Sequence, residues 1–301
     1  MKAAWRNQKH KKQWEMTLRE YAAPLRPLPV NKITTDDVLS VLKPIWNSKC
    51  ETASRLRGRI ERVLDAAKAQ GLRSGENPAR WRGHLDQLLP KRQRLTRGHH
   101  AAMPYADVPA FMAKLRARDA TAALALEFAI LTAARSGEVF GARWDELDMN
   151  GALWTVPAGR MKAGVVHDVP LSSRALAIVK KVRESRSGDF VFPGGKPGKP
   201  LSTMAFELLL RRMKIDGATA HGFRSAFRDW AGDRTDHPRD LVEAALAHMI
   251  ENKAEAAYRR STAIEKRRAL MNDWAAYLAR DTPAAFPAAN DNSAAAREVQ
   301  A

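Results

Sequence analysis

Residues 221–230 read HGFRSAFRDW, and the spacing within this stretch decides how the chain is interpreted. In a helix that begins at His221, the side chain of Arg224 lies one turn along on the same face. A histidine can transfer a proton, and a guanidinium can hold two oxygens of one anion. A lone histidine near apolar residues is more often structural, so it is the three-residue spacing that indicates an anion-binding site.

Four further residues with related chemistry lie in three other segments. They are Arg135 in LTAARSGEVFGARW (131–144), Lys162 in GRMKAGVVHDVPLS (159–172), and His248 and Tyr258 in ALAHMIENKAEAAYRRS (245–261). Arginines can bind the non-bridging oxygens of a phosphodiester, a lysine and histidines can move protons, and a phenol can act as nucleophile. The six residues together could hold and break one DNA phosphodiester without a metal ion.

In wording and order these segments strongly resemble the tyrosine recombinase family, especially prophage and genomic-island integrases. The resemblance runs from about Trp5 to about Leu278, and its most specific parts are His-x-x-Arg at 221–224 and a tyrosine ten residues after His248. It implies a site-specific DNA recombinase that cleaves and rejoins strands through a 3′-phosphotyrosyl intermediate, to integrate or excise a mobile element. Bond energy is stored in that intermediate, so no cofactor is expected.

The resemblance implies a role for each of the six residues. The expected roles are phosphate clamping by Arg135 and Arg224, proton transfer and phosphate binding by His221, a hydrogen bond to the scissile phosphate from His248, protonation of the departing 5′-oxygen by Lys162, and nucleophilic attack by Tyr258. Arg160 is close to Lys162 in sequence, but a guanidinium rarely gives up a proton and is the poorer acid. Tyr277 is expected to pack within a terminal helix.

The charge of the chain favours a polyanionic partner. Lysines and arginines number 51 against 33 aspartates and glutamates, which gives a net charge of +18, and residues 1–100 hold 22 of the former and 9 of the latter. The N-terminal third is therefore expected to hold double-stranded DNA by a salt-sensitive attraction. The expected DNA-binding residues are Arg55, Arg59 and Arg62 on one face of a long helix, and Lys91, Arg92 and Arg94 beyond it. A solvated amphipathic surface helix is the alternative for the first three.

The expected fold is mainly α-helical, with two domains. The segments are a helical core-type DNA-binding domain (1–90), a basic interdomain linker (91–104), a mostly helical catalytic domain with a small three-stranded antiparallel sheet (105–281), and a disordered tail (282–301). Thr35 is the expected N-cap of a helix that starts with Asp36 and Asp37. Asn150-Gly151 predicts a two-residue hairpin between the first two strands.

Other features bear on compartment and assembly. Cys50 is the single cysteine, which excludes an internal disulfide and a zinc ribbon. No apolar run approaches the ~20 residues of a membrane span, and the first residues lack the apolar core of a signal peptide. A cytoplasmic, nucleoid-associated protein without a membrane partner is expected. The resemblance implies attachment-type DNA sites as partners, with a monomer in solution and four protomers on two DNA sites.

Three other functions would use some of the same residues. A metal-dependent nuclease needs clustered carboxylates, and DELD at 145–148 supplies them, although a strand would alternate their faces. A truncated, non-recombining DNA-binding protein explains the charge but leaves the six residues unexplained. A type IB topoisomerase-like enzyme would use similar chemistry, so the motifs separate it poorly. Because the chain begins inside what resembles the core-binding domain, the N-terminal arm-binding domain of similar integrases is expected to be missing.

Overall fold

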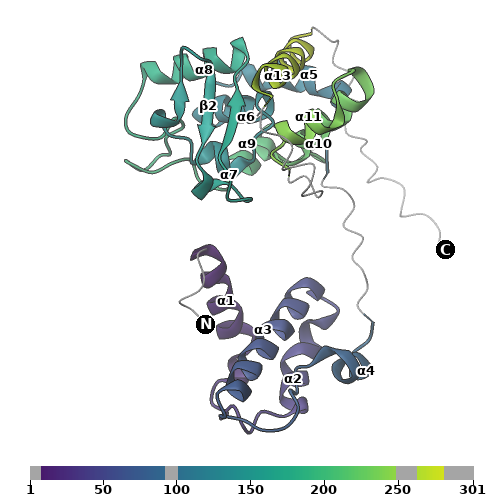
Figure 1. Cartoon of the computed structure of the whole chain (residues 1–301). Coiled ribbons are helices and arrows are strands. Elements are labelled where there is room, and N and C mark those ends of the chain that lie inside the picture. Colours follow the sequence, from purple (N-terminus) through teal and green to yellow (C-terminus); the bar gives the residue numbers. More distant parts are fainter. Residues whose placement is uncertain (1–7, 92–100, 249–262, 281–301) are drawn as a thin grey trace, which may run out of the picture. The chain divides into compact units, whose positions relative to one another are not determined.

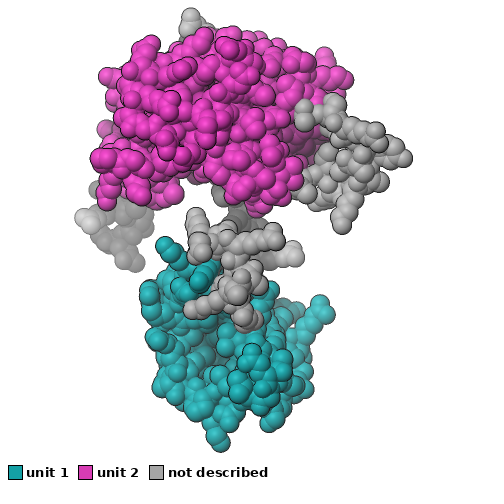
Figure 2. Space-filling view, turned by 60° about the vertical axis from the view of Figure 1, so that its left-hand side comes forward, with its two compact units in different colours: residues 1–97 teal, residues 98–301 magenta. Residues whose placement is uncertain are grey.

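The computed structural model divides the chain into two compact units, residues 1–97 and residues 98–301 (Figure 2). The structure describes residues 8–91, 101–248 and 263–280. The division falls inside the segment that composition predicts as a linker. Most of that segment and the predicted tail lie outside the described residues. The prediction of a mainly helical fold with one small antiparallel sheet is confirmed (Figure 1).

The first unit is helical. Its elements are α1 (Gln8–Tyr21), the 3₁₀ turn η2 (Ala23–Leu25), α2 (Thr35–Trp46), α3 (Cys50–Ala69), the π-helical turn η3 (Trp81–Leu85) and the short α4 (Asp86–Leu88). Val38 and Leu42 of α2 and Leu56 of α3 are fully buried in one core. Packing of these apolar faces holds the helices together, since helices of this length are marginal alone.

A capping box starts α2. The N-cap is Thr34, and the prediction of Thr35 is wrong by one residue. The Thr34 hydroxyl accepts the backbone N–H of Asp37, and the Asp37 carboxylate accepts the backbone N–H of Thr34 at 2.9 Å. Two adjacent threonines are equivalent as sequence signals, and the reciprocal bond with a carboxylate three residues on selects the first.

Arg59 joins α1 to α3. Its Nη1 donates to the carbonyl of Gln13 at 2.8 Å and to the Thr17 hydroxyl, and its guanidinium lies 5.4 Å from the ring centre of Trp14. The residue is only 7% exposed, whereas Arg55 and Arg62 are exposed. The expectation that all three arginines share one outward face is therefore wrong for Arg59, because α1 covers its position.

The second unit contains the other helices and the sheet (Figure 1). Its helices are α5 (Val108–Arg116), α6 (Thr121–Leu131), α7 (Ser136–Phe140), α8 (Ser173–Glu184), α9 (Ala205–Arg212), α10 (Gly222–Arg234), α11 (Arg239–Ala245) and α13 (Ile264–Leu278), with 3₁₀ turns η4 (Tyr105–Asp107), η5 (Trp144–Glu146) and η6 (Ala158–Arg160). Among the described residues, no helix combines the length and apolar character that crossing a membrane requires.

The sheet has the strand order β1 (Leu147–Asp148), β2 (Leu153–Val156), β3 (His167–Pro170), with both pairs antiparallel. Asp148 pairs with Leu153, so the first turn is longer than the predicted two-residue hairpin. The Asp148 carboxylate accepts the backbone N–H groups of Asn150 and Gly151, and a Cβ at Gly151 would lie 2.4 Å from that carboxylate. An aspartate turn of this kind overrides the simple Asn-Gly signal.

Trp274 of α13 centres the core of the second unit. Its ring is fully buried, lies 4.8 Å from that of Trp230 and 5.6 Å from that of Phe227, and its Nε1 donates to the Ile130 carbonyl at 2.9 Å. These contacts join α13 to α10 and α6. Tyr277 is 8% exposed beside Trp274, which confirms the prediction that it packs.

Replacing Arg59 with leucine is expected to release α1 from α3, because the carbonyl of Gln13 and the ring of Trp14 lose their cationic partner. The free energy of unfolding of the first unit should fall by roughly 1–3 kcal/mol. Hydrogen exchange in residues 8–21 should become faster than in the wild type. The matched variant Arg62→Leu changes an exposed residue and should leave both within error. Equal protection of α1 in the two variants would contradict the role of Arg59.

Candidate active site

Arg135 lies at the N-terminus of α7, where a buried glutamate holds it in place. The backbone N–H of Arg135 donates to Glu138 Oε2 at 2.9 Å, and its Nη1 donates to Glu138 Oε1 at 2.8 Å. Glu138 is 4% exposed. One carboxylate therefore caps the helix and orients the guanidinium at the same time. Its second terminal nitrogen, Nη2, donates to the carbonyl of Ala247 at 3.2 Å.

Arg224 approaches the same place from α10. Its side chain is buried, with Nη1 donating to the carbonyl of Ala133 and Nη2 donating to the carbonyl of Leu246 at 2.6 Å. Burial, together with the charge of Arg135, lowers the pKa of Arg224 to about 10. The guanidinium therefore stays charged at neutral pH. The two arginines donate to the adjacent carbonyls of Leu246 and Ala247, so they lie beside one backbone turn.

His248 follows this turn and touches both arginine and carboxylate. Its Nδ1 lies 2.5 Å from Glu243 Oε2, and its Nε2 lies 3.3 Å from Arg224 Nη2. Arg228 Nη2 lies 2.7 Å from the other oxygen of Glu243. The structure thus brings together Arg135, Arg224 and His248, three of the six residues singled out in the sequence.

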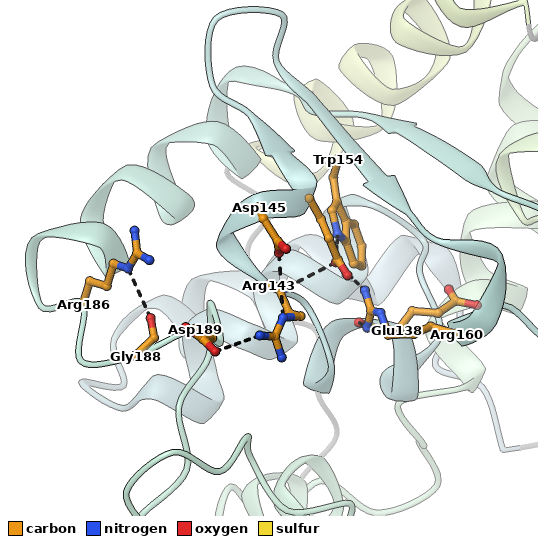
Figure 3. Close-up of polar contacts among 9 residues, drawn as sticks. Glu138, Arg143, Asp145, Trp154, Arg160, Arg186, Gly188 and Asp189 are labelled. Carbon is orange, nitrogen blue, oxygen red and sulfur yellow. Dashed lines mark hydrogen bonds and ion pairs between the residues drawn. The ribbon is translucent and has the colours of Figure 1, made fainter.

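Lys162 lies in the segment between β2 and β3 and is exposed. The segment is anchored two residues earlier, because Arg160 Nη1 donates to the carbonyl of Glu138 at 2.8 Å and Nη2 donates to Glu146 at 2.5 Å (Figure 3). The guanidinium of Arg160 therefore attaches the loop to α7. This leaves Lys162 as the basic side chain of the loop that extends into solvent. Its role as the acid stays a prediction.

The carboxylates of the DELD segment are engaged in local structure. Asp145 lies 3.8 Å from Arg143 (Figure 3), and Glu146 accepts the indole N–H of Trp154 at 3.1 Å. Asp148 caps the turn described above. In the described parts of the chain, no three His, Cys, Asp or Glu side chains are grouped so that they could hold a metal ion. These contacts give the segment a structural role as anchor of the sheet.

His221 is exposed at the start of α10. The next residue, Gly222, allows a close approach, because a Cβ there would lie 2.4 Å from the carbonyl of Ala101. His221 is thus held at the helix start by packing of its neighbour. Tyr258, the predicted nucleophile, lies outside the described residues. Tyr277 is a poorer candidate for the nucleophile, because burial raises the pKa of its phenol.

Three residues of this region were not predicted from the sequence. Glu138 stands three residues after Arg135, a capping-box spacing that could have indicated its role. Glu243 has no local signal, because its contact with His248 depends on how α11 ends. His167 of β3 lies among charged groups: burial first, and then the charge of Arg267, lower its pKa to about 4, against the influence of Glu138. Its imidazole is therefore neutral at physiological pH.

The expected DNA-binding residues fall into three groups. Arg55 and Arg62 are exposed on α3, and Arg55 Nε also pairs with Glu51 at 2.8 Å. Lys91 is exposed at the end of the first described stretch. Arg59 is buried as described above, and Arg92 and Arg94 lie outside the described residues. A role in DNA binding stays a prediction for this set.

Two family models match the chain. The model described as the phage integrase central domain matches residues 1–84, and the model described as the phage integrase family matches residues 102–264. The resemblance seen in the sequence is confirmed by these matches.

Curated relatives are similar over most of the chain. Prophage integrase IntA of Escherichia coli strain K12 is 30% identical over 268 residues, which cover 87% of this chain and 63% of the relative. Prophage integrase IntZ of the same strain is 34% identical over 247 residues, which cover 81% and 59%. The chain thus spans less than two thirds of the length of these relatives.

Solved structures share the fold. A lambda integrase dimer bound to a COC′ core site has a TM-score of 0.63 at 18% identity, covering 82% of this chain and 90% of that chain. A lambda integrase tetramer bound to a Holliday junction also has a TM-score of 0.63, at 19% identity, covering 84% and 72%. The Tn1549 transposon integrase in complex with circular intermediate DNA has a TM-score of 0.58 at 14% identity, covering 84% and 94%.

His167 is expected to make stability fall in mild acid. Its pKa is about 4 in the folded protein against 6.5 when exposed, so the unfolded state binds more protons between these values. The stabilisation is complete above pH 6.5 and is lost as the pH falls toward 4. At pH 5 the free energy of unfolding of the second unit should be lower by roughly 2 kcal/mol than at pH 7.5 from this group alone. Urea unfolding at both pH values should show the difference, and His167→Gln should reduce it; an undiminished difference would contradict the assignment.

Proposed function

This chain belongs to the phage integrase family, and on that premise we propose that it is a tyrosine-type site-specific DNA recombinase. It cleaves and rejoins DNA strands at attachment-type sites through a 3′-phosphotyrosyl intermediate. The biological outcome is integration or excision of a mobile element. The family match and the geometry of the arginine site support this proposal together, and neither would suffice alone, because one fold can serve several functions.

The observation that carries the proposal is the convergence of Arg135, Arg224 and His248 beside the turn at Leu246 and Ala247. A phosphodiester carries its charge on two non-bridging oxygens, and attack adds charge to a five-coordinate phosphorus. Preorganised cationic donors stabilise that change, because they need no reorganisation at the moment of reaction. Two guanidinium groups beside one backbone turn have the composition of such a site.

The steps of the reaction use the remaining predicted residues. The Tyr258 phenol attacks the phosphorus and forms a 3′-phosphotyrosyl bond, while the bond to the 5′-oxygen breaks. Lys162 protonates that oxygen, and His221 binds the phosphate and takes up the proton that the phenol loses; both proton transfers are reversed in the second step. The 5′-hydroxyl of the partner strand then attacks the phosphotyrosine and releases Tyr258. Each step exchanges one phosphodiester for another, so no cofactor enters the balance.

The assembly that we propose is a homotetramer on two double-stranded DNA sites, formed from monomers in solution. Lambda integrase supports this by analogy, since its structures include a dimer on a core site and a tetramer on a Holliday junction. The net charge of +18 supports a DNA partner. We place the protein in the cytoplasm at the nucleoid, where such DNA would be found.

A covalent adduct tests the chemistry directly. A duplex with a nick near the cleavage point, carrying candidate sites from the DNA that flanks the gene, should trap the wild type as a protein–DNA adduct on a denaturing gel. Tyr258→Phe should form none, because the phenol oxygen makes the new bond. The matched control Tyr277→Phe changes a buried tyrosine and should keep the adduct. Addition of a chelator should leave the yield unchanged.

Three outcomes would decide against the proposal. An undiminished adduct in Tyr258→Phe would remove Tyr258 as the nucleophile, and loss of the adduct with chelator would favour a metal-dependent nuclease. A wild-type protein that relaxes supercoiled plasmids but never joins two sites would favour a topoisomerase-like enzyme.

The exposed arginines of α3 should contribute to the salt dependence of DNA binding. If Arg55 and Arg62 each contact one phosphate, the double change to glutamine should reduce the slope of log affinity against log salt by roughly 2. Arg211→Gln, which removes an exposed arginine paired with Glu207 at 3.1 Å, is the matched control and should leave the slope unchanged. Fluorescence anisotropy at several salt concentrations measures both. Equal slopes in all three proteins would exclude α3 as a phosphate-binding surface.

A further inference from the structure

The ring of His248 is held between an acceptor and a donor. Glu243 Oε2 lies 2.5 Å from Nδ1, and Arg224 Nη2 lies 3.3 Å from Nε2. A carboxylate can only accept and a guanidinium can only donate. The neutral ring that satisfies both partners carries its proton on Nδ1 and a lone pair on Nε2. In the free protein His248 Nε2 is thus a hydrogen-bond acceptor.

The backbone fixes Glu243 and His248 relative to each other. The N–H of His248 donates to the carbonyl of Glu243 at 3.0 Å, across a helix end at which Ala247 has a left-handed φ of 50°. This is the arrangement of a helix C-terminus closed by a bond spanning five residues. The side-chain and main-chain bonds together place the imidazole at the end of α11, facing Arg224.

Glu243 is held in its charged form. Burial acts to raise its pKa, but the hydrogen bond from His248 and the charge of Arg228 outweigh burial, so the pKa lies below its ordinary value. Arg228 Nη2 lies 2.7 Å from Glu243 Oε1. One carboxylate oxygen is therefore directed at Arg228, and the other accepts from the ring.

We propose that Glu243 is a positioning residue for the recombination reaction, which fixes His248 as the Nδ1–H form and stabilises its imidazolium when the scissile phosphate binds. This inference rests on the proposed function. A phosphodiester oxygen accepts hydrogen bonds and donates none, so an acceptor Nε2 cannot bond to it. His248 must take up one proton from the solvent at Nε2 as the phosphate arrives, and Glu243 supplies the opposing charge.

The surrounding charges make Glu243 the decisive counterion. From α10, Arg224 contacts His248 and Arg228 pairs with Glu243. Arg135 reaches the neighbouring carbonyl of Ala247 from α7 together with its partner Glu138. Three guanidinium groups disfavour a further positive charge on the imidazole. Glu138 pairs with Arg135. The carboxylate that offsets this repulsion at His248 directly is therefore Glu243.

The tautomer of the His248 ring can be measured in the free protein, without DNA cleavage. In the full chain labelled with ¹⁵N-histidine, two-bond ¹H–¹⁵N spectra at a pH where the ring is neutral should show the Nδ1–H form for His248, assigned by its loss in His248→Asn. Glu243→Met removes the acceptor, and the Nδ1–H signal of His248 should move from its wild-type position because that hydrogen bond is lost. Glu207→Met, an equal change at an exposed ion pair of α9, should leave the spectrum unaltered. A wild-type ring in the Nε2–H form would overturn the assignment.

Cleavage kinetics test the functional part. Single-turnover formation of the Tyr258 adduct at pH 8 should be slower by roughly 10- to 100-fold in Glu243→Met, by analogy with other residues that orient a functional histidine. The rate of Glu243→Met should recover as the pH is lowered, since excess protons replace the missing stabilisation of the imidazolium. Glu243→Gln keeps an acceptor but loses the charge, so its rate should lie between those of Glu243→Met and the wild type. Melting temperatures identify any variant that fails to fold.

The outcomes separate this inference from the proposed function. A wild type that shows the Nδ1–H form but makes no Tyr258-dependent adduct would overturn the proposed function and leave the positioning of His248 intact. A wild type that makes the adduct, with Glu243→Met folded and unchanged in rate and pH profile, would overturn the role of Glu243 alone. A slower variant whose pH profile keeps its shape would also overturn it, since a purely structural defect lowers the rate at every pH.

Discussion

The guanidinium of Arg224 joins segments that are far apart in the sequence, and the site depends on it. It donates to the carbonyl of Ala133, just after α6, and to that of Leu246, at the end of α11. The last carbonyls of a helix have no intrahelical partner and need a donor when they are buried. A charged donor is worth about 1.5–3 kcal/mol per bond, part of which offsets the removal of the guanidinium from water. The bonds that complete these helix ends are also the bonds that place the arginine.

Around α7, single residues again both hold the fold together and place a candidate site residue. Glu138 caps the helix and orients Arg135, and its own carbonyl receives Arg160, which anchors the loop that carries Lys162. Figure 3 also shows Arg143, whose Nη2 donates to the carboxylate of Asp189 in the segment after α8. The candidate residues Arg135 and Lys162 are thus supported by Glu138 and Arg160, which also connect secondary structure elements. Rigid support of this kind is what a preorganised site requires.

Features that depend on local sequence pattern could be predicted from the sequence. Residue roles that depend on tertiary contacts could not. The helical character of both units, the small antiparallel sheet and the helix that starts at His221 depend on local pattern, and these predictions are confirmed. The helix α7 is too short for periodicity to indicate it. Arg59 looks like its neighbours on α3 until α1 covers it, and Glu243 acquires its partner only through the way in which α11 ends. Such roles are set by contacts between segments, which no spacing rule encodes.

The two arginines differ in how their charge is compensated, and this difference bears on the proposed reaction. Arg135 is paired with the buried Glu138, so its charge is largely neutralised before DNA binds. Arg224 has only carbonyl dipoles and the imidazole of His248 as hydrogen-bond partners in the described structure, and yet with a pKa of about 10 it remains cationic at neutral pH. A buried charge without a carboxylate partner is costly in the free protein. In the proposed reaction an incoming phosphate would relieve that cost, so we expect Arg224 to supply most of the electrostatic attraction and Arg135 most of the geometry. A site in which both arginines were paired with carboxylates would be more stable empty and would bind the phosphodiester less strongly.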